Sequence, residues 1–78
     1  MTNTESALLD IAKALVTADG STVDMVTSEV RGGVAYAYSV ERVGEGAYRS
    51  AKVFAEVGSD GRAYVNNRPV DIGFGVGA

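Results

Sequence analysis

Hydrophobic and polar positions follow two different periods along the chain, and the change between them falls near Gly20. Before that residue the apolar side chains recur every three or four positions and form one stripe: Leu8, Ile11, Ala12 and Leu15. This spacing predicts an amphipathic α-helix over about residues 4–18, with one apolar face that must be covered. The glycine supplies the stop signal at its carboxyl end.

After residue 20 the pattern alternates with a period of two, in runs rich in Val, Tyr, Ala and Thr. The turn signals "RGG", "GEG", "GSDG" and "NN" separate strands expected at about 22–30, 34–43, 47–57, 62–65 and 68–72. Because every connection is short, the strands are expected to pair antiparallel in chain order. Pro69 lacks a donor N–H and marks the fifth strand as an edge strand or a short one.

These elements predict an α+β fold in a single domain, residues 1–78, with one N-terminal helix packed on a five-stranded antiparallel β-meander. The sheet is expected over about residues 22–72. The glycine-rich segment 73–78 is expected to be a flexible tail.

The turns also predict a register for each hairpin. A two-residue turn at Gly32 and Gly33 and a left-handed Gly61 each set one hairpin, and Asn66 and Asn67 set the last. A turn centred on Glu45 fixes the long central hairpin. The expected pairs are Tyr36 with Phe54, Tyr38 with Lys52, Glu41 with Arg49, Arg42 with Tyr48, Val57 with Ala63, Ala55 with Val65, and Ala63 with Val70.

With this register the sheet has two unlike faces. One is small and apolar, and is expected to lie under the helix: Val26, Val30, Ala35, Ala37, Ala51, Val53, Ala55, Val57, Ala63 and Val65. The other mixes aromatic and charged residues: Met25, Tyr36, Tyr38, Tyr48, Phe54 and Tyr64, with Glu29, Arg42, Lys52, Glu56 and Arg62. Since only one helix is expected, the aromatic side has no obvious intramolecular cover and resembles a binding surface.

Three other interpretations of the aromatic side stay open at this point. The aromatic pairs can serve only to stabilise a solvent-facing sheet, with Lys and Arg stems lying over the rings. The faces can be reversed, so that the aromatics lie under the helix and the alanines are exposed. The rings can also stack on the bases of single-stranded RNA, but the acidic charge and the absence of an RNP-type motif disfavour this.

Charge and composition narrow the function classes. Ten acidic and seven basic residues give a net charge of −3, which disfavours direct nucleic-acid binding and suits a protein partner with a basic surface. The chain contains no Cys and no His, so disulfides and an ordinary zinc site are excluded. The first residues lack a basic region and a long apolar run, so we expect no signal peptide, no membrane span and a cytoplasmic location.

No catalytic motif is present. The segments "GEGAYRS" and "GFGVG" lack the strand–turn–helix context that a phosphate-binding loop needs. We therefore expect a protein that is not an enzyme, without catalytic, cofactor-binding or metal-binding residues. A different candidate feature is an acidic edge formed by Asp19, Asp24 and Glu41, which could imitate phosphates before a basic partner.

A short, acidic, cysteine-free α+β chain resembles the small phage- and prophage-encoded inhibitors of bacterial defence, anti-CRISPR proteins among them, in size, charge and architecture. The resemblance implies docking on a CRISPR–Cas effector subunit in the host cytoplasm and occlusion of its DNA-contacting surface. The expected partner-binding residues are four aromatic anchors, Tyr36, Tyr38, Phe54 and Tyr64, and four steering acids, Asp19, Asp24, Glu29 and Glu56. The alternative is a structural or homodimeric domain that buries its aromatic face against a second copy.

Overall fold

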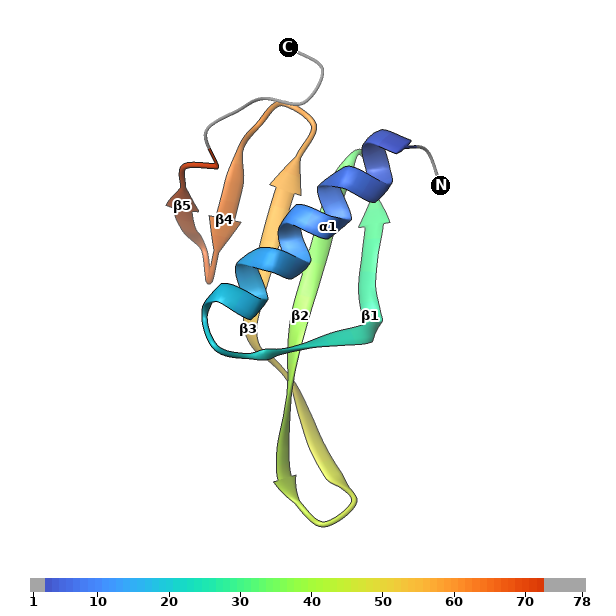
Figure 1. The fold of residues 1–78 in the computed structure, drawn as a ribbon, viewed down its shortest axis with the longest axis vertical. Helices are drawn as coiled ribbons and strands as arrows, with labels where there is room; N and C mark the ends of the chain where they lie inside the picture. Colours follow the sequence, from blue (N-terminus) through green and yellow to red (C-terminus); the bar gives the residue numbers. More distant parts are fainter. Residues whose placement is uncertain (1–2, 73–78) are drawn as a thin grey trace.

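The computed structural model describes residues 3–72, with side chains throughout except at 50–52, so the predicted tail at 73–78 lies outside the described residues. One helix precedes five strands: α1 (Asn3–Ala18), β1 (Thr22–Arg31), β2 (Val34–Gly44), β3 (Ala47–Gly58), β4 (Ala63–Val65) and β5 (Arg68–Val70). The strands form one antiparallel sheet in the order β1-β2-β3-β4-β5, and α1 crosses one face of it (Figure 1). The predicted α+β meander is confirmed.

Helix α1 packs through the apolar stripe that its sequence predicts. Leu8, Ala12 and Val16 are buried, and Leu15 is half-buried against the same core. Complete burial of a leucine such as Leu8 contributes about 2 kcal/mol relative to an exposed side chain. The helix ends at a turn in which Gly20 adopts a φ of 85°, and the chain then enters β1.

The sheet meets the helix with small side chains. One row of paired residues crosses all five strands on this face: Val30, Ala35, Val57, Ala63 and Val70. Ala35, Ala37 and Ala55 are completely buried. Because alanine extends only one carbon from the backbone, the helix can approach the sheet closely and exclude water from the core between them.

The predicted turns are present except at the tip of the β2–β3 hairpin, where Gly44 pairs with Ala47, so the turn is Glu45–Gly46 and is not centred on Glu45. Gly32 and Gly33 both have positive φ, as a type I′ hairpin turn requires. Asn66 and Asn67 have φ values of 52° and 64°, and asparagine tolerates this region better than other side chains do. β5 is a three-residue edge strand that contains Pro69, as expected.

Two bulges interrupt the ladders on either side of β2, at the level of Tyr38 and Ser39. Asp24 and Glu29 of β1 are opposite Tyr38 and Tyr36 of β2, so the β1 segment between the two pairs has three residues more than the β2 segment. Ser50 and Phe54 of β3 are opposite Val40 and Tyr38 of β2, so the β3 segment between the two pairs has two residues more than the β2 segment. Bulges bend a strand and increase its twist, and β1 turns sharply at this point (Figure 1).

Serine hydroxyls close both bulges. In the β1 bulge, Ser28 Oγ donates to the Asp24 carbonyl at 2.6 Å and accepts from the Tyr38 N–H at 3.3 Å. In the β3 bulge, Ser39 Oγ accepts from the Val53 N–H at 2.7 Å, and Ser39 is only 1% exposed. Each hydroxyl therefore replaces a backbone partner that the irregular ladder no longer supplies.

The bulges correct part of the expected register. Between residues 47 and 50, β3 pairs with β2 as predicted, but beyond the bulge Tyr36 faces Glu56 and Tyr38 faces Phe54. The predicted pairs of Tyr36 with Phe54 and of Tyr38 with Lys52 are therefore wrong by two residues. Because the shift in β3 is an even number, the β3 side chains beyond the bulge keep their predicted face, whereas the β1 bulge shifts the pairing by three residues and moves residues 22–24 to the opposite face from the one expected.

Val26 was expected in the core and is instead 93% exposed. It lies in the β1 bulge, where the backbone leaves the ladder and loops outward. The remaining half of β1 returns to the sheet, so Val30 is half-buried against the core as predicted.

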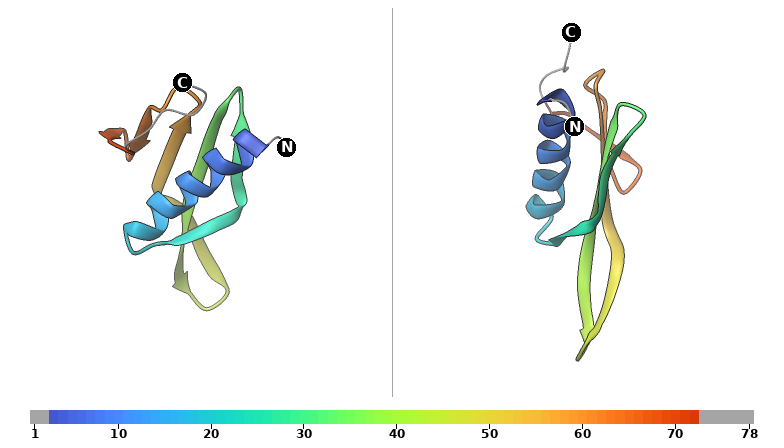
Figure 2. Two further views of the ribbon diagram at one scale, coloured as in Figure 1. Left: turned by 45° about the horizontal axis from the view of Figure 1, so that its top comes forward. Right: turned by 90° about the vertical axis from the view of Figure 1, so that its right-hand side faces the viewer.

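Beyond the bulges β2 and β3 continue as a two-stranded arm, residues 40–50, which projects past the end of α1 (Figure 1; Figure 2, right). In the described part of the chain, residues 41–44 pair only with residues 47–49. Glu41 and Arg49 form an ion pair across the arm. The arm accounts for much of the 45 Å length of the molecule.

Replacement of Ser39 by Ala should lower the free energy of unfolding by about 1–3 kcal/mol, because the buried Val53 N–H would lose its acceptor. Ser59→Ala is the control, since Ser59 is exposed in the β3–β4 turn, and its loss should stay within about 0.5 kcal/mol. Urea denaturation followed by circular dichroism measures both. Equal stability of the two variants would show that the β3 bulge does not depend on the hydroxyl.

Candidate protein-interaction surface

The face of the sheet opposite α1 carries the aromatic residues. No described element covers it, since the helix lies entirely on the other side (Figure 2, right). We call this the aromatic face and define it by the residues whose pairing places them together: Glu29, Arg31, Val34, Tyr36, Tyr38, Phe54, Glu56 and Tyr64. Six of the eight predicted partner-binding residues therefore lie on one surface, and a seventh, Asp24, is paired with Tyr38 at its edge.

A single row of paired residues crosses all five strands of the aromatic face: Glu29, Tyr36, Glu56, Tyr64 and Pro69. Carboxylates and aromatic rings alternate along it. Glu56 is directly opposite Tyr36 on one side and Tyr64 on the other. This arrangement results from the bulge in β3, since the predicted register would have put Phe54 opposite Tyr36.

The second aromatic pair lies next to this row. Tyr38 and Phe54 are cross-strand partners with ring centroids 6.5 Å apart and planes tilted by 32°. Both rings are half-buried, and a pair of this kind adds about 0.5–1.5 kcal/mol beyond the area it buries. Asn66 also joins the β4–β5 turn to β3, because its N–H donates to the Phe54 carbonyl and its Oδ1 accepts from the Phe54 N–H.

The charged side chains on this face differ in whether they are paired. Arg31 forms an ion pair with Glu29 at 3.0 Å, and its guanidinium lies 5.0 Å from the centre of the Tyr36 ring. Arg62 is paired with Asp60 at 3.5 Å. Both pairs are exposed, so each contributes at most about 1 kcal/mol. Glu56, at the centre, makes no hydrogen bond or ion pair with any residue that the structure describes.

A shallow hollow of about 200 Å³ opens beside Glu56 on the aromatic face. Its lining is formed by Val34, Glu56, Gly58, Asp60, Arg62 and Tyr64. Gly58 contributes no side chain, and a Cβ built there would come within 2.8 Å of Asp60 Oδ1. That oxygen accepts the Arg62 N–H at 3.0 Å, so the glycine leaves room for the turn and for the hollow.

The other two predicted steering acids do not present a free carboxylate on the aromatic face, although Asp24 is the cross-strand partner of Tyr38. Asp24 is 9% exposed, and its Oδ1 accepts the N–H groups of Val26 and Thr27 at 3.0 and 3.4 Å. Its carboxylate therefore stabilises the β1 bulge and is not available to a partner. Asp19 is exposed after the end of α1, where it borders a hollow with Arg68 and Val70.

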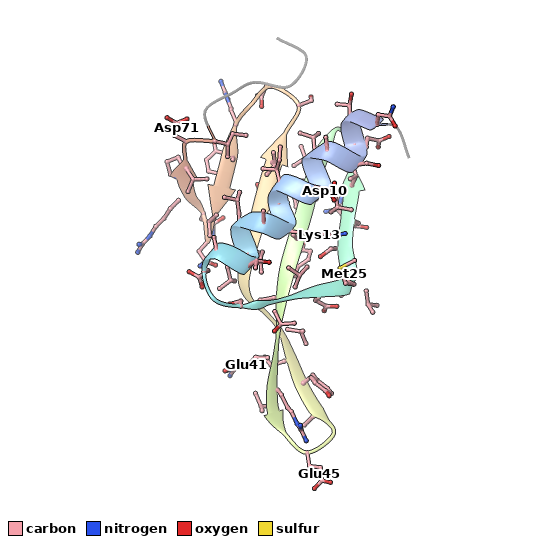
Figure 3. All side chains as sticks on the ribbon, viewed as in Figure 1. Asp10, Lys13, Met25, Glu41, Glu45 and Asp71 are labelled. Carbon is pink, nitrogen blue, oxygen red and sulfur yellow. The ribbon has the colours of Figure 1, made fainter. Side chains whose placement is uncertain are left out.

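The expected acidic edge of Asp19, Asp24 and Glu41 is not assembled as a common surface. Asp24 binds its own bulge, and Glu41 is paired with Arg49 on the projecting arm (Figure 3). Asp19 precedes the sheet, and Asp24 and Glu41 lie on opposite faces of it, since Asp24 is level with Tyr38 and residues 38 and 41 of β2 point to opposite sides.

A second set of apolar side chains is exposed outside the aromatic face; the sequence predicted Met25 and Tyr48 on the uncovered side but missed the exposure of Val26 and Val43. The set consists of Met25 and Val26 in the β1 bulge and Val43 and Tyr48 on the arm, each more than half exposed. Met25 projects at the corner where β1 turns (Figure 3). A signal was present, since the consecutive apolar residues 25 and 26 cannot both lie on the core face of a regular strand.

Over residues 3–72 the structure contains no group of three or more side chains placed to hold a metal ion. Within the same range no helix has both the length and the apolar character needed to cross a membrane.

Comparison of the chain with protein-family models, with curated proteins and with solved structures gave no match.

Adjacent residues on β4 test which face is the core. Ala63 belongs to the core row and Tyr64 to the aromatic row. Ala63→Asn should lower stability by about 3 kcal/mol or more, because it buries an amide and overfills the contact with the helix. Tyr64→Asn should cost about 1 kcal/mol and leave the domain folded. Thermal unfolding by circular dichroism measures both, and similar losses would contradict the assignment of the faces.

Proposed function

We propose that this protein is a non-enzymatic protein-binding module that docks through the aromatic face on a partner with a basic surface. The observation that carries the proposal is that tyrosine, phenylalanine and carboxylate side chains occupy a sheet face that no described element covers. The core is complete on the other face, so the aromatic residues are not needed under the helix.

The composition of the aromatic face supports a role in protein recognition. Tyrosine and arginine are the residues that most often dominate binding energy at protein interfaces, together with tryptophan. Tyr36, Tyr38, Phe54 and Tyr64 are half-buried by their neighbours on the sheet, so little side-chain freedom remains to be lost on binding. Pre-organised aromatic anchors of this kind lengthen the lifetime of a complex.

The charge of the chain supports a basic partner. The net charge of −3 attracts positively charged surfaces over about a Debye length, which raises the association rate. On the aromatic face, Glu29 already pairs with Arg31, whereas Glu56 has no such pair among the described residues. The central carboxylate therefore supplies the charge that a basic partner would meet.

We further propose that binding inhibits the partner, as in the small anti-CRISPR-type inhibitors that the chain resembles in size, charge and architecture. A basic protein surface that contacts nucleic acid presents Arg and Lys side chains. A module that covers these side chains with carboxylates and tyrosines competes with the nucleic acid for the same groups. Occlusion of a nucleic-acid-binding host complex, such as a CRISPR–Cas effector subunit, requires no catalysis.

The proposal is tested by capturing partners on the immobilised protein from a bacterial lysate and measuring the affinity of the purified partner for variants. Tyr64→Ala and Tyr38→Ala should each weaken binding by more than about ten-fold with the fold retained, because they remove anchors from the aromatic face. Tyr48→Ala is the matched control on the arm and should change the affinity by less than about two-fold.

Two outcomes would contradict the proposal. Loss of binding in Tyr48→Ala but not in Tyr64→Ala would move the interface to the arm. A sedimentation mass of twice 8.1 kDa that Tyr64→Ala returns to the monomer value would assign the aromatic face to a second copy of the chain. Inhibition itself is measured as displacement of a fluorescent oligonucleotide from the partner, and binding without displacement would exclude the inhibitory role.

A further inference from the structure

Glu56 is the least compensated charge on the aromatic face. It is half-buried in the middle of β3 and lies between the cross-strand partners Tyr36 and Tyr64. Across the part of the chain that the structure describes, it has no hydrogen bond and no ion pair, whereas Glu29 and Asp60 on the flanks each have an arginine. A carboxylate that is partly withdrawn from water and unpaired is a strong acceptor for a cation.

The same face already contains one complete site of this kind. Arg31 forms an ion pair with Glu29 and places its guanidinium 5.0 Å from the centre of the Tyr36 ring. One carboxylate and one tyrosine ring, paired across neighbouring strands, thus hold one guanidinium. Glu56 and Tyr64 repeat the carboxylate and the ring in the same cross-strand relation on β3 and β4, without a guanidinium.

The hollow beside Glu56 supplies the space for the missing group. Glu56 and Tyr64 form part of its wall, and the absence of a side chain at Gly58 keeps it open. Arg62 borders the hollow as well, but its guanidinium is paired with Asp60, and its side chain is 77% exposed. Arg62 is therefore directed to Asp60 and does not pair with Glu56.

We propose that the hollow formed by Glu56, Tyr64 and Gly58 is the receptor for an arginine side chain of the partner, which pairs with the Glu56 carboxylate and stacks on the Tyr64 ring. This inference rests on the proposed function, because it names the group that a basic partner inserts into the aromatic face. A guanidinium fits better than an ammonium, since it is planar, donates two parallel N–H groups to a carboxylate and stacks on an aromatic ring.

The test uses three short capped peptides, Gly-Arg-Gly, Gly-Lys-Gly and Gly-citrulline-Gly, titrated into the labelled protein and followed by NMR. Citrulline keeps the planar shape of arginine without its charge. The arginine peptide should shift the side-chain resonances of Glu56 and Tyr64, with an affinity at least about five-fold higher than that of the citrulline peptide. The lysine peptide should fall between them, because it pairs with the carboxylate but stacks less well.

The variant Glu56→Gln should remove the preference for arginine over citrulline, because it keeps the shape of the side chain and removes the charge. Glu45→Gln is the matched control at the exposed tip of the arm and should keep the preference (Figure 3). Equal binding of arginine and citrulline peptides by the unaltered protein, or an arginine preference that survives in Glu56→Gln, would overturn the inference.

The proposed function and this inference can fail separately. If the partner captured by the protein is lost with Tyr64→Ala but is bound normally by Glu56→Gln, the aromatic face is a docking surface and the arginine receptor is wrong. If the arginine peptide shifts Glu56 and Tyr64 but no captured partner depends on Tyr64, the receptor is present and the proposed docking function is wrong.

Discussion

Two serine hydroxyls, one on β1 and one on β2, hold the sheet in the shape on which the rest of the molecule depends. Ser28 closes the bulge in β1, and Ser39 closes the bulge in β3, both by hydrogen bonds that a regular ladder would have made with backbone groups. The two bulges flank Tyr38 of β2, and the molecule divides just beyond them, where β1 begins with Thr22 opposite Val40. One part is a five-stranded region under α1, and the other is a two-stranded arm beyond it (Figure 1). The same bulge in β3 sets which residues face each other on the aromatic face.

One face of the five-stranded region is buried and the other is open, because one helix can cover only one of them. On the covered face small side chains let α1 come close, and Ala35, Ala37 and Ala55 are completely buried there. On the open face large rings and charged stems shield one another, so the tyrosines are half-buried without a covering element. Stability therefore depends on the alanine side. The aromatic side is the surface proposed to bind, and its central carboxylate, Glu56, has no ion pair among the residues that the structure describes.

Local signals in the sequence were sufficient for the elements and turns. The helix, the five strands and the positive φ values at Gly61, Asn66 and Asn67 follow from patterns within a few residues of one another. The bulges were not predicted, because they depend on side-chain contacts between distant segments, such as Ser39 on β2 with Val53 on β3. For the same reason Val26 was wrongly placed in the core, and Asp24 was expected on the surface although its carboxylate caps the bulge.

The sequence by itself determined which side chains share a face, because alternation along a strand survives any register shift of an even number of residues. Tyr36, Tyr38, Phe54 and Tyr64 were therefore assigned to one surface before their partners were known. The predicted register of β3 and β4 also put Tyr64 opposite Glu56, but only the tertiary structure decided that Tyr36 lies on the other side of that carboxylate. The physical reason is the bulge in β3, which inserts two extra residues into that strand, keeps its faces and shifts the β2 partners of the residues that follow it by two positions.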